Sequence, residues 1–336
     1  MKEAYLYKKL VGLKVRCDLC NHRCVIENGN KGICGVRKNT DGVLFSMVYD
    51  KVISENVDPI EKKPLFHFLP GSLSLSIAAP GCNFKCFFCQ NWQISQAPCD
   101  SDSIEGRKIP PEKLVQDAVR NNCLSISYTY TEPTIYFELA YDTAKIAKEN
   151  KIRNVFVTNG FMSSECLEMI CPYLDAANID LKSFSESFYK DCAGGRLGPV
   201  LENIKRMHNM GIWIEVTTLL IPGLNDSEKE ISEIAGFLSN LSNAIPWHIS
   251  AYYPQYKSRI DATKHQSILN AVEIGKKAGL KYVYGGNIAG GSIENTFCSI
   301  CGNENIKRAG FSIAKNKLIN GSCGNCGNKI EGVWEK

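Results

Sequence analysis

The sequence predicts an α/β protein with a central parallel β-sheet, and three observations lead to this prediction. Between residues 72 and 286, short apolar segments with strand character alternate with amphipathic segments that have helical spacing. Six or more such strand–helix units follow one another, which is typical of a parallel sheet covered by helices. Clustered cysteines flank this region on both sides. The alternation alone leaves an open doubly wound sheet and a complete or partial (β/α) barrel as alternatives.

Local signals place the elements in chain order. Pro111 is a favoured first residue of a helix, and Gly211 suits the end of one. Ser227 and Glu230 form a capping box that starts another helix. The strands are expected at 73–79, 124–130, 154–157, 176–181, 213–221, 248–253 and 282–284. The helices are expected at 111–121, 135–149, 164–173, 199–210, directly after 227, and at 262–278.

Composition and charge limit the class of protein. The chain has 336 residues and a net charge of +4, which is too small to indicate nucleic acid or a membrane surface as a partner. The first residues lack the apolar core of a signal peptide, and no apolar run approaches the roughly 18 residues of a membrane-spanning helix. We therefore expect a cytoplasmic protein. In a reducing compartment its 16 cysteines are expected to be metal ligands rather than disulfides.

Three cysteines form the central motif of the chain. Cys82, Cys86 and Cys89 follow the first predicted strand directly, with Phe88 just before the last of them. Thiolates at this spacing on a tight loop can reach one soft metal centre. A closed zinc site and an ordinary [4Fe–4S] cluster each take four protein ligands, so three thiols leave one metal position open. A zinc loop and three unrelated core thiols are the alternatives.

Polar groups follow the other predicted strands at the same end. Glu132 comes after the second strand, Asn159 after the third, and Asp180 with Lys182 after the fourth. Each group alone is compatible with a turn or a helix cap. Because the carboxyl ends of parallel strands meet at one edge of a sheet, we expect these groups to gather beside the cysteine loop.

Residues 1–70 are expected to form an N-terminal cysteine-rich extension. Four thiols occur in the pattern Cys-x2-Cys-x3-Cys-x9-Cys among Asn and Gly residues, namely Cys17, Cys20, Cys24 and Cys34. They can bind tetrahedral zinc or a four-ligand iron–sulfur cluster, and we favour zinc because a small loop-built knuckle is its usual setting. His22 is expected at the surface beside the knuckle. Residues 50–64 are polar and contain two prolines, so a connecting segment is expected there.

Residues 287–336 are expected to form a C-terminal zinc ribbon. Two Cys-x2-Cys pairs, each followed by glycine, supply four thiolates for one tetrahedral zinc, namely Cys298, Cys301, Cys323 and Cys326. A strand is expected between the pairs at 310–314, and a hinge or lid at 285–291. The remaining thiols are expected in the core or at the surface: Cys99, Cys123, Cys166, Cys171 and Cys192.

The order of these motifs resembles the activating-enzyme branch of the radical S-adenosylmethionine (SAM) superfamily, similar to pyruvate formate-lyase activating enzyme. Within that branch it looks most like the radical SAM enzyme of the AmmeMemoRadiSam system. The resemblance rests on the knuckle at 17–37, the cysteine loop at 82–89, the segments at 128–134, 156–160 and 178–182, and the C-terminal cysteine pairs. It implies that residues 71–286 form a partial (β/α)6 barrel.

The resemblance also implies roles for individual residues. Cys82, Cys86 and Cys89 would hold a [4Fe–4S] cluster. Thr131 and Glu132 stand where the family binds the SAM amino group, although two glycines of the family's segment are replaced here. Residues that match contacts to the SAM ribose and carboxylate are Asn159, Asp180 and Lys182. Phe88 would pack on the adenine. The family often has a histidine near the sixth strand end, where this chain has Tyr253, with His248 earlier.

These implications predict a radical SAM enzyme that cleaves SAM to a 5′-deoxyadenosyl radical. The substrate would be a protein or peptide, such as a glycyl radical enzyme or a Memo-like or AMMECR-domain partner, or a small molecule. A flavodoxin- or ferredoxin-type protein would donate the electron. The alternative is a non-enzymatic iron–sulfur or zinc protein, either an electron carrier or a ribbon that binds nucleic acid or protein. That alternative predicts four-ligand metal sites throughout and no role for Glu132 or Asp180.

Overall fold

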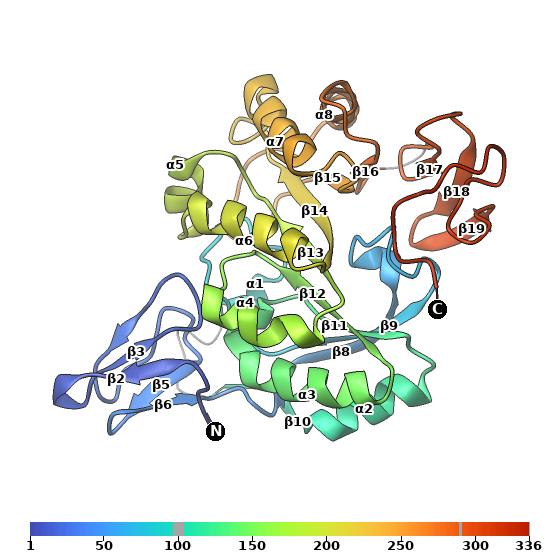
Figure 1. Ribbon diagram of the computed structural model, residues 1–336. Coiled ribbons are helices and arrows are strands. Elements are labelled where there is room, and N and C mark those ends of the chain that lie inside the picture. The colour runs from blue at the N-terminus through green and yellow to red at the C-terminus, as the bar shows by residue number, and fades with distance from the viewer. Residues whose placement is uncertain (97–103, 289–290, 336) are drawn as a thin grey trace.

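The computed structural model describes residues 1–96, 104–288 and 291–335, and its centre is an eight-stranded sheet (Figure 1). Seven strands are parallel neighbours, and an eighth runs antiparallel at one edge. In spatial order they are β16 (Val283–Gly286), β15 (Trp247–Ala251), β14 (Trp213–Leu220), β13 (Ala176–Asp180), β12 (Arg153–Thr158), β11 (Ser125–Tyr128), β9 (Leu73–Ala78) and β8 (Ser54–Pro59). Because β16 and β8 end the sheet without pairing to each other, the fold is a partial barrel. Every predicted parallel strand is confirmed.

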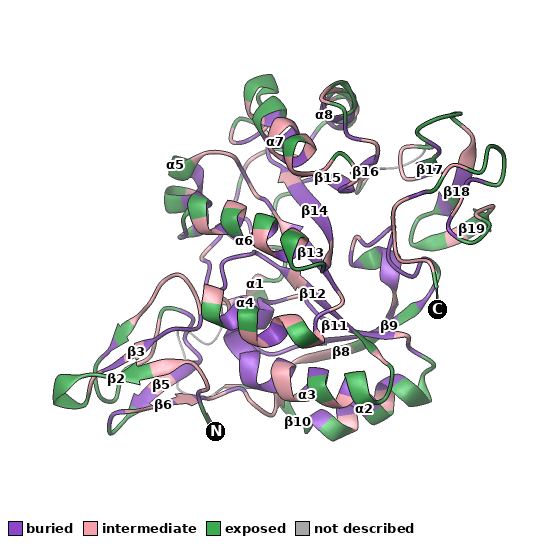
Figure 2. Ribbon diagram, in the orientation of Figure 1, coloured by how far each residue is buried: buried purple, intermediate pink, exposed green. Residues whose placement is uncertain are grey.

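Helices cover the outer face of the sheet, and their buried stripes face it (Figures 1 and 2). These helices are α2 (Pro111–Arg120), α3 (Phe137–Glu149), α4 (Ser164–Ile170), α6 (Leu197–Asn209), α7 (Glu228–Leu241) and α8 (His265–Lys277). Two short helices, α1 (Trp92–Ser95) and α5 (Glu186–Phe188), follow the cysteine loop and β13. The capping box is confirmed, since Oγ of Ser227 accepts from the Glu230 amide at the start of α7. The helix predicted at 135–149 is preceded by a 3-10 turn over Pro133–Tyr136.

At β9 and β11 the inner face of the sheet is polar although it is buried. In β9 the residues alternate between Leu75 or Ile77 and small serines, as the period of two in a strand requires. Ser74 hydrogen-bonds Ser127 of the neighbouring strand at 2.6 Å. This alternation gives β9 an apolar side for the helices and a polar side for the interior of the barrel.

The N-terminal region consists of short antiparallel strands at one end of the barrel, drawn in blue in Figure 1. They are β1 (Lys2–Glu3), β2 (Tyr7–Lys9), β3 (Val15–Cys17), β4 (Val25–Ile26), β5 (Arg37–Thr40), β6 (Val43–Ser46) and β7 (Lys51–Val52), with β10 (Arg107–Lys108) pairing with β7. The prediction of a connecting segment at 50–64 is wrong in part, because β8 lies within it and pairs with β9 over six residues. Polar residues at a half-exposed sheet edge leave no apolar period that would reveal the strand.

The C-terminal region forms a three-stranded antiparallel sheet on the open side of the barrel (Figure 1). Its strands are β17 (Thr296–Phe297), β18 (Glu304–Ala309) and β19 (Ser312–Asn316). The strand predicted at 310–314 therefore lies two residues later, with Gly310 and Phe311 in the turn. Arg308 of β18 is buried and donates to the Phe66 carbonyl at 2.9 Å. This contact ties the region to Phe66, which lies in the segment between β8 and β9.

Candidate active site in the partial barrel

The cysteine loop starts at the carboxyl end of β9 and turns back sharply. Gly81 has a φ of +107°, and a Cβ at this position would lie 2.8 Å from Cγ1 of Val36, so the turn requires glycine. Cys86 is buried, while Cys82 and Cys89 are partly exposed to the cavity. The loop thus presents three sulfurs inward from one short stretch of chain.

The donor set around these sulfurs fits a cluster with one open iron. The Phe84 amide lies 3.4 Å from Sγ of Cys82, and Oγ of Ser95 lies 3.3 Å from Sγ of Cys89. Hydrogen bonds to the sulfurs are a usual feature of iron–sulfur sites. Burial raises the pKa of the Cys86 thiol to about 12, so a bound cation is needed to hold the thiolate at neutral pH. Among the described residues that line the cavity there is no fourth cysteine.

All predicted site residues in the barrel line the same cavity, which has a volume of about 440 Å³. They are Cys82, Cys86, Phe88, Cys89, Thr131, Glu132, Asn159, Asp180 and Lys182. The expectation that the polar strand ends gather beside the cysteine loop is therefore met in the structure. The physical reason is the parallel sheet, which brings the carboxyl ends of β9, β11, β12 and β13 to one rim.

Glu132 organises this rim from a fully buried position. Its Oε1 accepts hydrogen bonds from the backbone and hydroxyl of Thr134 at 3.1 and 2.6 Å and from the Thr158 hydroxyl at 2.7 Å. Its Oε2 accepts from the Asn159 amide at 2.8 Å. Burial raises the pKa of Glu132, and these donors oppose the rise. The carboxylate therefore joins the ends of β11 and β12 and presents Oε2 beside Asn159.

Asn159 continues this network to the cysteine loop. Its side-chain Nδ2 donates to Oδ1 of Asn83 at 2.7 Å, and its Oδ1 accepts from the Phe161 amide at 3.0 Å. Asn83 is the residue after Cys82 and is fully buried, and its own Nδ2 has no hydrogen-bond partner. The loop is thus held in place by a side chain from the third strand end.

Asp180 and Lys182 form an ion pair of 2.8 Å at the end of β13. Burial lowers the pKa of Lys182, but Asp180 and the Cys86 sulfur raise it more, so the net shift is upward and the ammonium is stable. Its electrostatic coupling to Cys86 places a fixed positive charge beside the cysteine loop. Asp180 keeps about 37% of its side chain exposed, which leaves carboxylate surface for a ligand.

Phe88 and Thr131, the two remaining predicted residues, contact other parts of the protein. Phe88 is buried and its ring lies 5.9 Å from that of Phe188, centroid to centroid. The Thr131 hydroxyl donates to the Ala79 carbonyl at 2.7 Å, which joins β11 to the strand before the cysteine loop. Both side chains still contribute to the cavity wall.

Tyr130 is a strained residue at the cavity that the sequence analysis did not identify as a site. Its φ of +63° lies in the left-handed region, which costs a non-glycine residue about 1–2 kcal/mol. Its hydroxyl donates to Asp58 of β8, which also pairs with Lys63 at 2.7 Å. Burial lowers the pKa of Lys63 to about 8, and Asp58 opposes this shift. The edge strand missed in the sequence thus supplies the group that holds Tyr130.

Other lining residues were also missed in the sequence. They are Lys62, Pro64, Phe84, Gln90, Asn91, Ser95, Thr129, Val157, Thr158, Thr217, Leu219, Ser250, Asn287 and Phe311. Thr217 and Ser250 lie on the inward side of predicted strands, so the period of two contained a signal for them. Phe311 comes from the turn of the C-terminal sheet, and no local pattern places it at the barrel.

His248 and Tyr253, the two residues considered for the end of the sixth predicted strand, lie outside the cavity lining. His248 is buried near the start of β15, where its Nε2 contacts Glu215 at 2.6 Å. Tyr253 is about 48% exposed, and its hydroxyl donates to the Asn287 carbonyl at 3.0 Å. Neither belongs to the cavity lining, whereas Asn287 itself does.

The four C-terminal thiols converge to the spacing of a zinc site. The Cys298 and Cys326 sulfurs are 3.6 Å apart, and those of Cys301 and Cys323 are 3.8 Å apart. Tetrahedral zinc with bonds of about 2.3 Å places its sulfurs about 3.8 Å from one another. The geometry of this group therefore fits the predicted ligand set.

The other cysteines fall into different surroundings. The N-terminal thiols Cys17, Cys20, Cys24 and Cys34 line a separate small cavity together with Arg37. His22, expected at the surface, is half-buried and contacts the Asn83 carbonyl with its Nε2 at 2.8 Å. Cys123 and Cys166 are buried, while Cys171 and Cys192 are partly exposed. Cys99 lies outside the described residues, as do positions 289 and 290 of the expected hinge.

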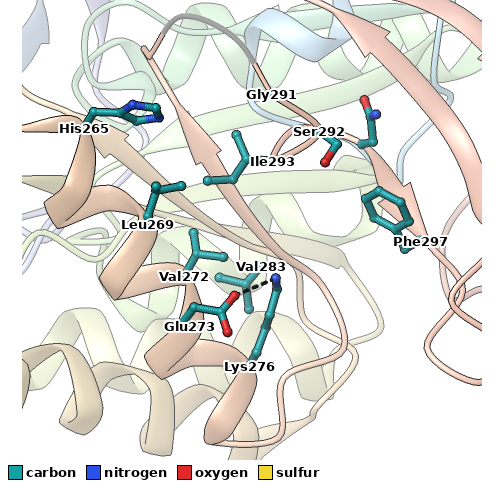
Figure 3. A pocket seen from close by; sticks show the side chains of 11 residues that line it. His265, Leu269, Val272, Glu273, Lys276, Val283, Gly291, Ser292, Ile293 and Phe297 are labelled. Carbon is teal, nitrogen blue, oxygen red and sulfur yellow. Dashed lines mark hydrogen bonds and ion pairs between the residues drawn. The ribbon is translucent and has the colours of Figure 1, made fainter.

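A larger cavity of about 580 Å³ lies away from this site, between α8, β16 and the start of the C-terminal region (Figure 3). Its charged groups include Glu273 and Lys276, which pair with each other at 3.0 Å on the surface of α8. The described residues that line it include no cysteine. The larger of these two cavities is therefore not the one that contains the cysteine loop.

Comparison with known proteins gives the same picture. The sequence model of the radical SAM superfamily matches residues 76–238. A protein of Methanocaldococcus jannaschii described as uncharacterised is 44% identical over 98% of this chain and 99% of its own length. The pyruvate formate-lyase-activating enzyme of Clostridium pasteurianum is 22% identical over 54% of this chain and 78% of that enzyme.

Among solved structures, the crystal structure of a radical SAM methyltransferase from Sphaerobacter thermophilus is similar, with a TM-score of 0.52 at 16% identity. The match covers 65% of this chain and 67% of the methyltransferase, and it concerns the fold. No helix among the described residues is long and apolar enough to cross a membrane.

Proposed function

Because this chain belongs to the radical SAM superfamily, we propose that it is an activating-enzyme-like oxidoreductase whose reaction takes place in the cavity of the partial barrel. The observation that carries the proposal is that three cysteines and the polar ends of three further strands line one cavity. A [4Fe–4S] cluster bound there would supply the electron for reductive cleavage of SAM to methionine and a 5′-deoxyadenosyl radical, which would abstract a hydrogen atom from the substrate.

The residues of the chain have separate tasks in this proposal. Cys82, Cys86 and Cys89 would hold the cluster, and three protein ligands would leave a position open for SAM. Lys182 is a cavity-lining cation that is electrostatically coupled to Cys86, and it would offset the charge of the SAM carboxylate. Glu132 presents Oε2 to the SAM ammonium, because its Oε1 is already occupied by three donors.

The rest of the cavity orients the nucleoside part of SAM. Asp180, which is partly exposed, accepts the ribose hydroxyls. Phe88 provides the apolar wall for the adenine. Asn159 uses both ends of its side chain within the protein, so its task is to position the loop rather than to reach the ribose. The walls exclude water from a reactive radical.

We propose a protein substrate, because relatives such as the pyruvate formate-lyase-activating enzyme act on glycyl radical enzymes. A Memo-like or AMMECR-domain partner is the corresponding proposal for the AmmeMemoRadiSam branch, and the motif order supports it. A flavodoxin- or ferredoxin-type donor in a cytoplasmic setting would supply the electron. Zinc on Cys298, Cys301, Cys323 and Cys326 is proposed as a structural ion that holds the C-terminal sheet.

The test is electron paramagnetic resonance (EPR) of the anaerobically reconstituted and reduced protein, with and without SAM. We expect a reduced-cluster signal that shifts when SAM is added, together with formation of 5′-deoxyadenosine. Cys86→Ala should abolish both the shift and the product, whereas Cys123→Ala, which removes a buried thiol outside the metal sites, should keep them. Wild-type protein that forms no 5′-deoxyadenosine under these conditions would contradict the proposal.

A further inference from the structure

We propose that His22 positions the peptide bond between Asn83 and Phe84, and thereby raises the reduction potential of a cluster held by the barrel cysteines. This inference rests on the proposed function, because it needs a cluster on the cysteine loop. The sequence pattern indicated a surface position for His22, and the tasks proposed above do not include it. In the structure its side chain is half-buried and contacts the cysteine loop.

A single peptide unit takes part in both hydrogen bonds that carry the proposal. Its carbonyl, on Asn83, lies 2.8 Å from Nε2 of His22. Its amide, on Phe84, donates to Sγ of Cys82 at 3.4 Å. Because a carbonyl oxygen can only accept, Nε2 carries the proton and donates it. The peptide therefore connects the histidine ring to the sulfur of a proposed cluster ligand.

Packing holds the imidazole of His22 in this position. Its ring lies 4.9 Å from the Phe161 ring, centroid to centroid, at an interplanar angle of 60°. Phe161 is fully buried and lies 5.1 Å from the Phe84 ring in the same way. A Cβ on Gly195 would lie 2.5 Å from Cε1 of Phe84, so the Phe84 ring is tightly enclosed. The three rings thus form one packed row beside the peptide.

Other contacts anchor the cysteine loop independently of His22. The Asn83 side chain is fully buried, and its Oδ1 accepts from Nδ2 of Asn159 at 2.7 Å. At the start of the loop, a Cβ on Gly81 would lie 2.8 Å from Cγ1 of Val36, so these two residues are in close contact. Removing the imidazole should therefore affect the 83–84 peptide more than the course of the loop.

The hydrogen bond from the Phe84 amide to the Cys82 sulfur gives His22 its influence on a cluster. Hydrogen bonds to the sulfurs help to set the potential of an iron–sulfur cluster. A reduced cluster carries one more negative charge, so a donor directed at a sulfur stabilises the reduced form more. His22 fixes the direction of this donor and polarises it through the carbonyl, because hydrogen bonds in a chain strengthen one another. Loss of His22 should therefore lower the potential.

The test is a redox titration of the anaerobically reconstituted protein, followed by EPR of the component whose signal changes when SAM is added. This component belongs to the barrel cysteines, whichever metal the N-terminal thiols bind. In His22→Leu, the ratio of reduced to oxidised cluster at a fixed potential should fall roughly threefold or more, since one hydrogen bond is lost. A wild-type midpoint potential in His22→Leu would overturn the proposal.

Two further variants separate the hydrogen bond from the bulk of the ring. The amide nitrogen in His22→Gln can reach the position of Nε2, whereas the shorter side chain in His22→Asn cannot. We expect the wild-type potential in His22→Gln and a lowered one in His22→Asn, and equal potentials in the two would refute the role of the donor. This pair also gives the comparison if His22→Leu does not fold.

Arg23→Gln is the matched control in the same turn of the knuckle. The Arg23 side chain pairs with Asp18 at 3.0 Å and with Glu165 at 2.6 Å, so its loss should leave the potential unchanged. Iron and zinc contents should equal those of the wild type in every variant, because none removes a thiol.

Failure of the proposed function would give a different result from failure of this inference. If the barrel cysteines bind no cluster, the wild type shows no SAM-sensitive signal, and both proposals are wrong. If the wild type shows that signal and forms 5′-deoxyadenosine, while His22→Leu keeps the wild-type potential, only the role of His22 is refuted.

Discussion

The side-chain amide of Asn159 donates a 2.7 Å hydrogen bond to the side-chain carbonyl of Asn83, and this bond joins the end of β12 to the cysteine loop. The backbone amide of Asn159 is in turn held by Glu132 at 2.8 Å. A chain of buried polar contacts thus runs from the second strand end to the residue after Cys82. The position of the cysteine loop therefore depends on these contacts and not on the sequence of the loop alone.

Asn159→Ala is predicted to weaken SAM cleavage while the barrel thiols remain. The substitution leaves the buried Asn83 carbonyl without its donor, a loss of about 1–3 kcal/mol that loosens the loop. We expect the rate of 5′-deoxyadenosine formation to fall roughly tenfold or more. Asn150→Ala, at the exposed end of α3, is the control. Equal rates in Asn159→Ala and wild type would show that the loop is held by other contacts.

Lys182→Gln is predicted to weaken SAM binding without loss of iron. The variant removes the fixed positive charge beside Cys86 and leaves Asp180 unpaired, and a charged hydrogen bond contributes about 1.5–3 kcal/mol. Equilibrium binding should show a Kd for SAM that is roughly tenfold higher or more. Lys229→Gln, a substitution on the exposed surface of α7, should leave the Kd unchanged. The role of Lys182 would be refuted by wild-type affinity in its variant.

Arg308→Leu is predicted to destabilise the protein, because Arg308 joins the C-terminal sheet to the segment between β8 and β9. Arg308 lies 4.0 Å from the centroid of the Phe66 ring and donates to the backbone of Phe66 and Glu294. Its loss leaves buried carbonyls unpaired, and we expect unfolding free energy to fall by about 2–4 kcal/mol in chemical denaturation. The neighbouring exposed residue gives the control, Lys307→Leu, which should change stability by about 0.5 kcal/mol or less.

Cys301→Ala is predicted to release the C-terminal metal and lower the thermal midpoint. The residue is exposed, so its substitution removes little packing, and any large effect reports the lost ligand. Cys192→Ala removes a partly exposed thiol that belongs to no metal group and serves as the control. Zinc released per chain and the unfolding midpoint are measured together. A midpoint that stays the same after the metal is lost would rule out a structural role for this ion.

His67 is predicted to make the protein less stable in acid. Burial lowers the pKa of His67 to about 4, compared with about 6.5 when unfolded. Between these values the unfolded chain binds more protons, so unfolding free energy falls as pH falls from about 6.5 to about 4, by about 3 kcal/mol in all. The ring contacts the Glu331 carbonyl and the Tyr284 hydroxyl, each at 2.6 Å.

The measurement for His67 is chemical denaturation at pH 5 and at pH 7.5. His67→Gln can keep both hydrogen bonds but cannot titrate, so the difference in stability between the two pH values should shrink. His265→Gln, at the exposed start of α8, should retain the wild-type difference. If His67→Gln keeps it as well, the acid sensitivity originates elsewhere.

Much of the central sheet could be predicted because its signals are local. The alternation of apolar and polar residues in β9 and the capping box at Ser227 are readable within a few residues. β8 was missed for the opposite reason, since its strand conformation comes from pairing with β9 and its own residues are polar. The position of Phe311 at the cavity could not be predicted either, because it depends on how the C-terminal sheet packs against the barrel.

The three thiols of the cysteine loop, the two four-cysteine groups and the order of the polar strand ends can all be read from the sequence. Short spacings and strand periods are properties of residues that are close in sequence, so they can be recognised without a structure. The tertiary structure decided which groups meet: Asn159 with Asn83, Arg308 with Phe66, and Tyr130 with Asp58. It also brought the ligand atoms of Cys298, Cys301, Cys323 and Cys326 to within 4.8 Å of one another. Distances between residues far apart in the chain arise only when the sheet and its flanks pack.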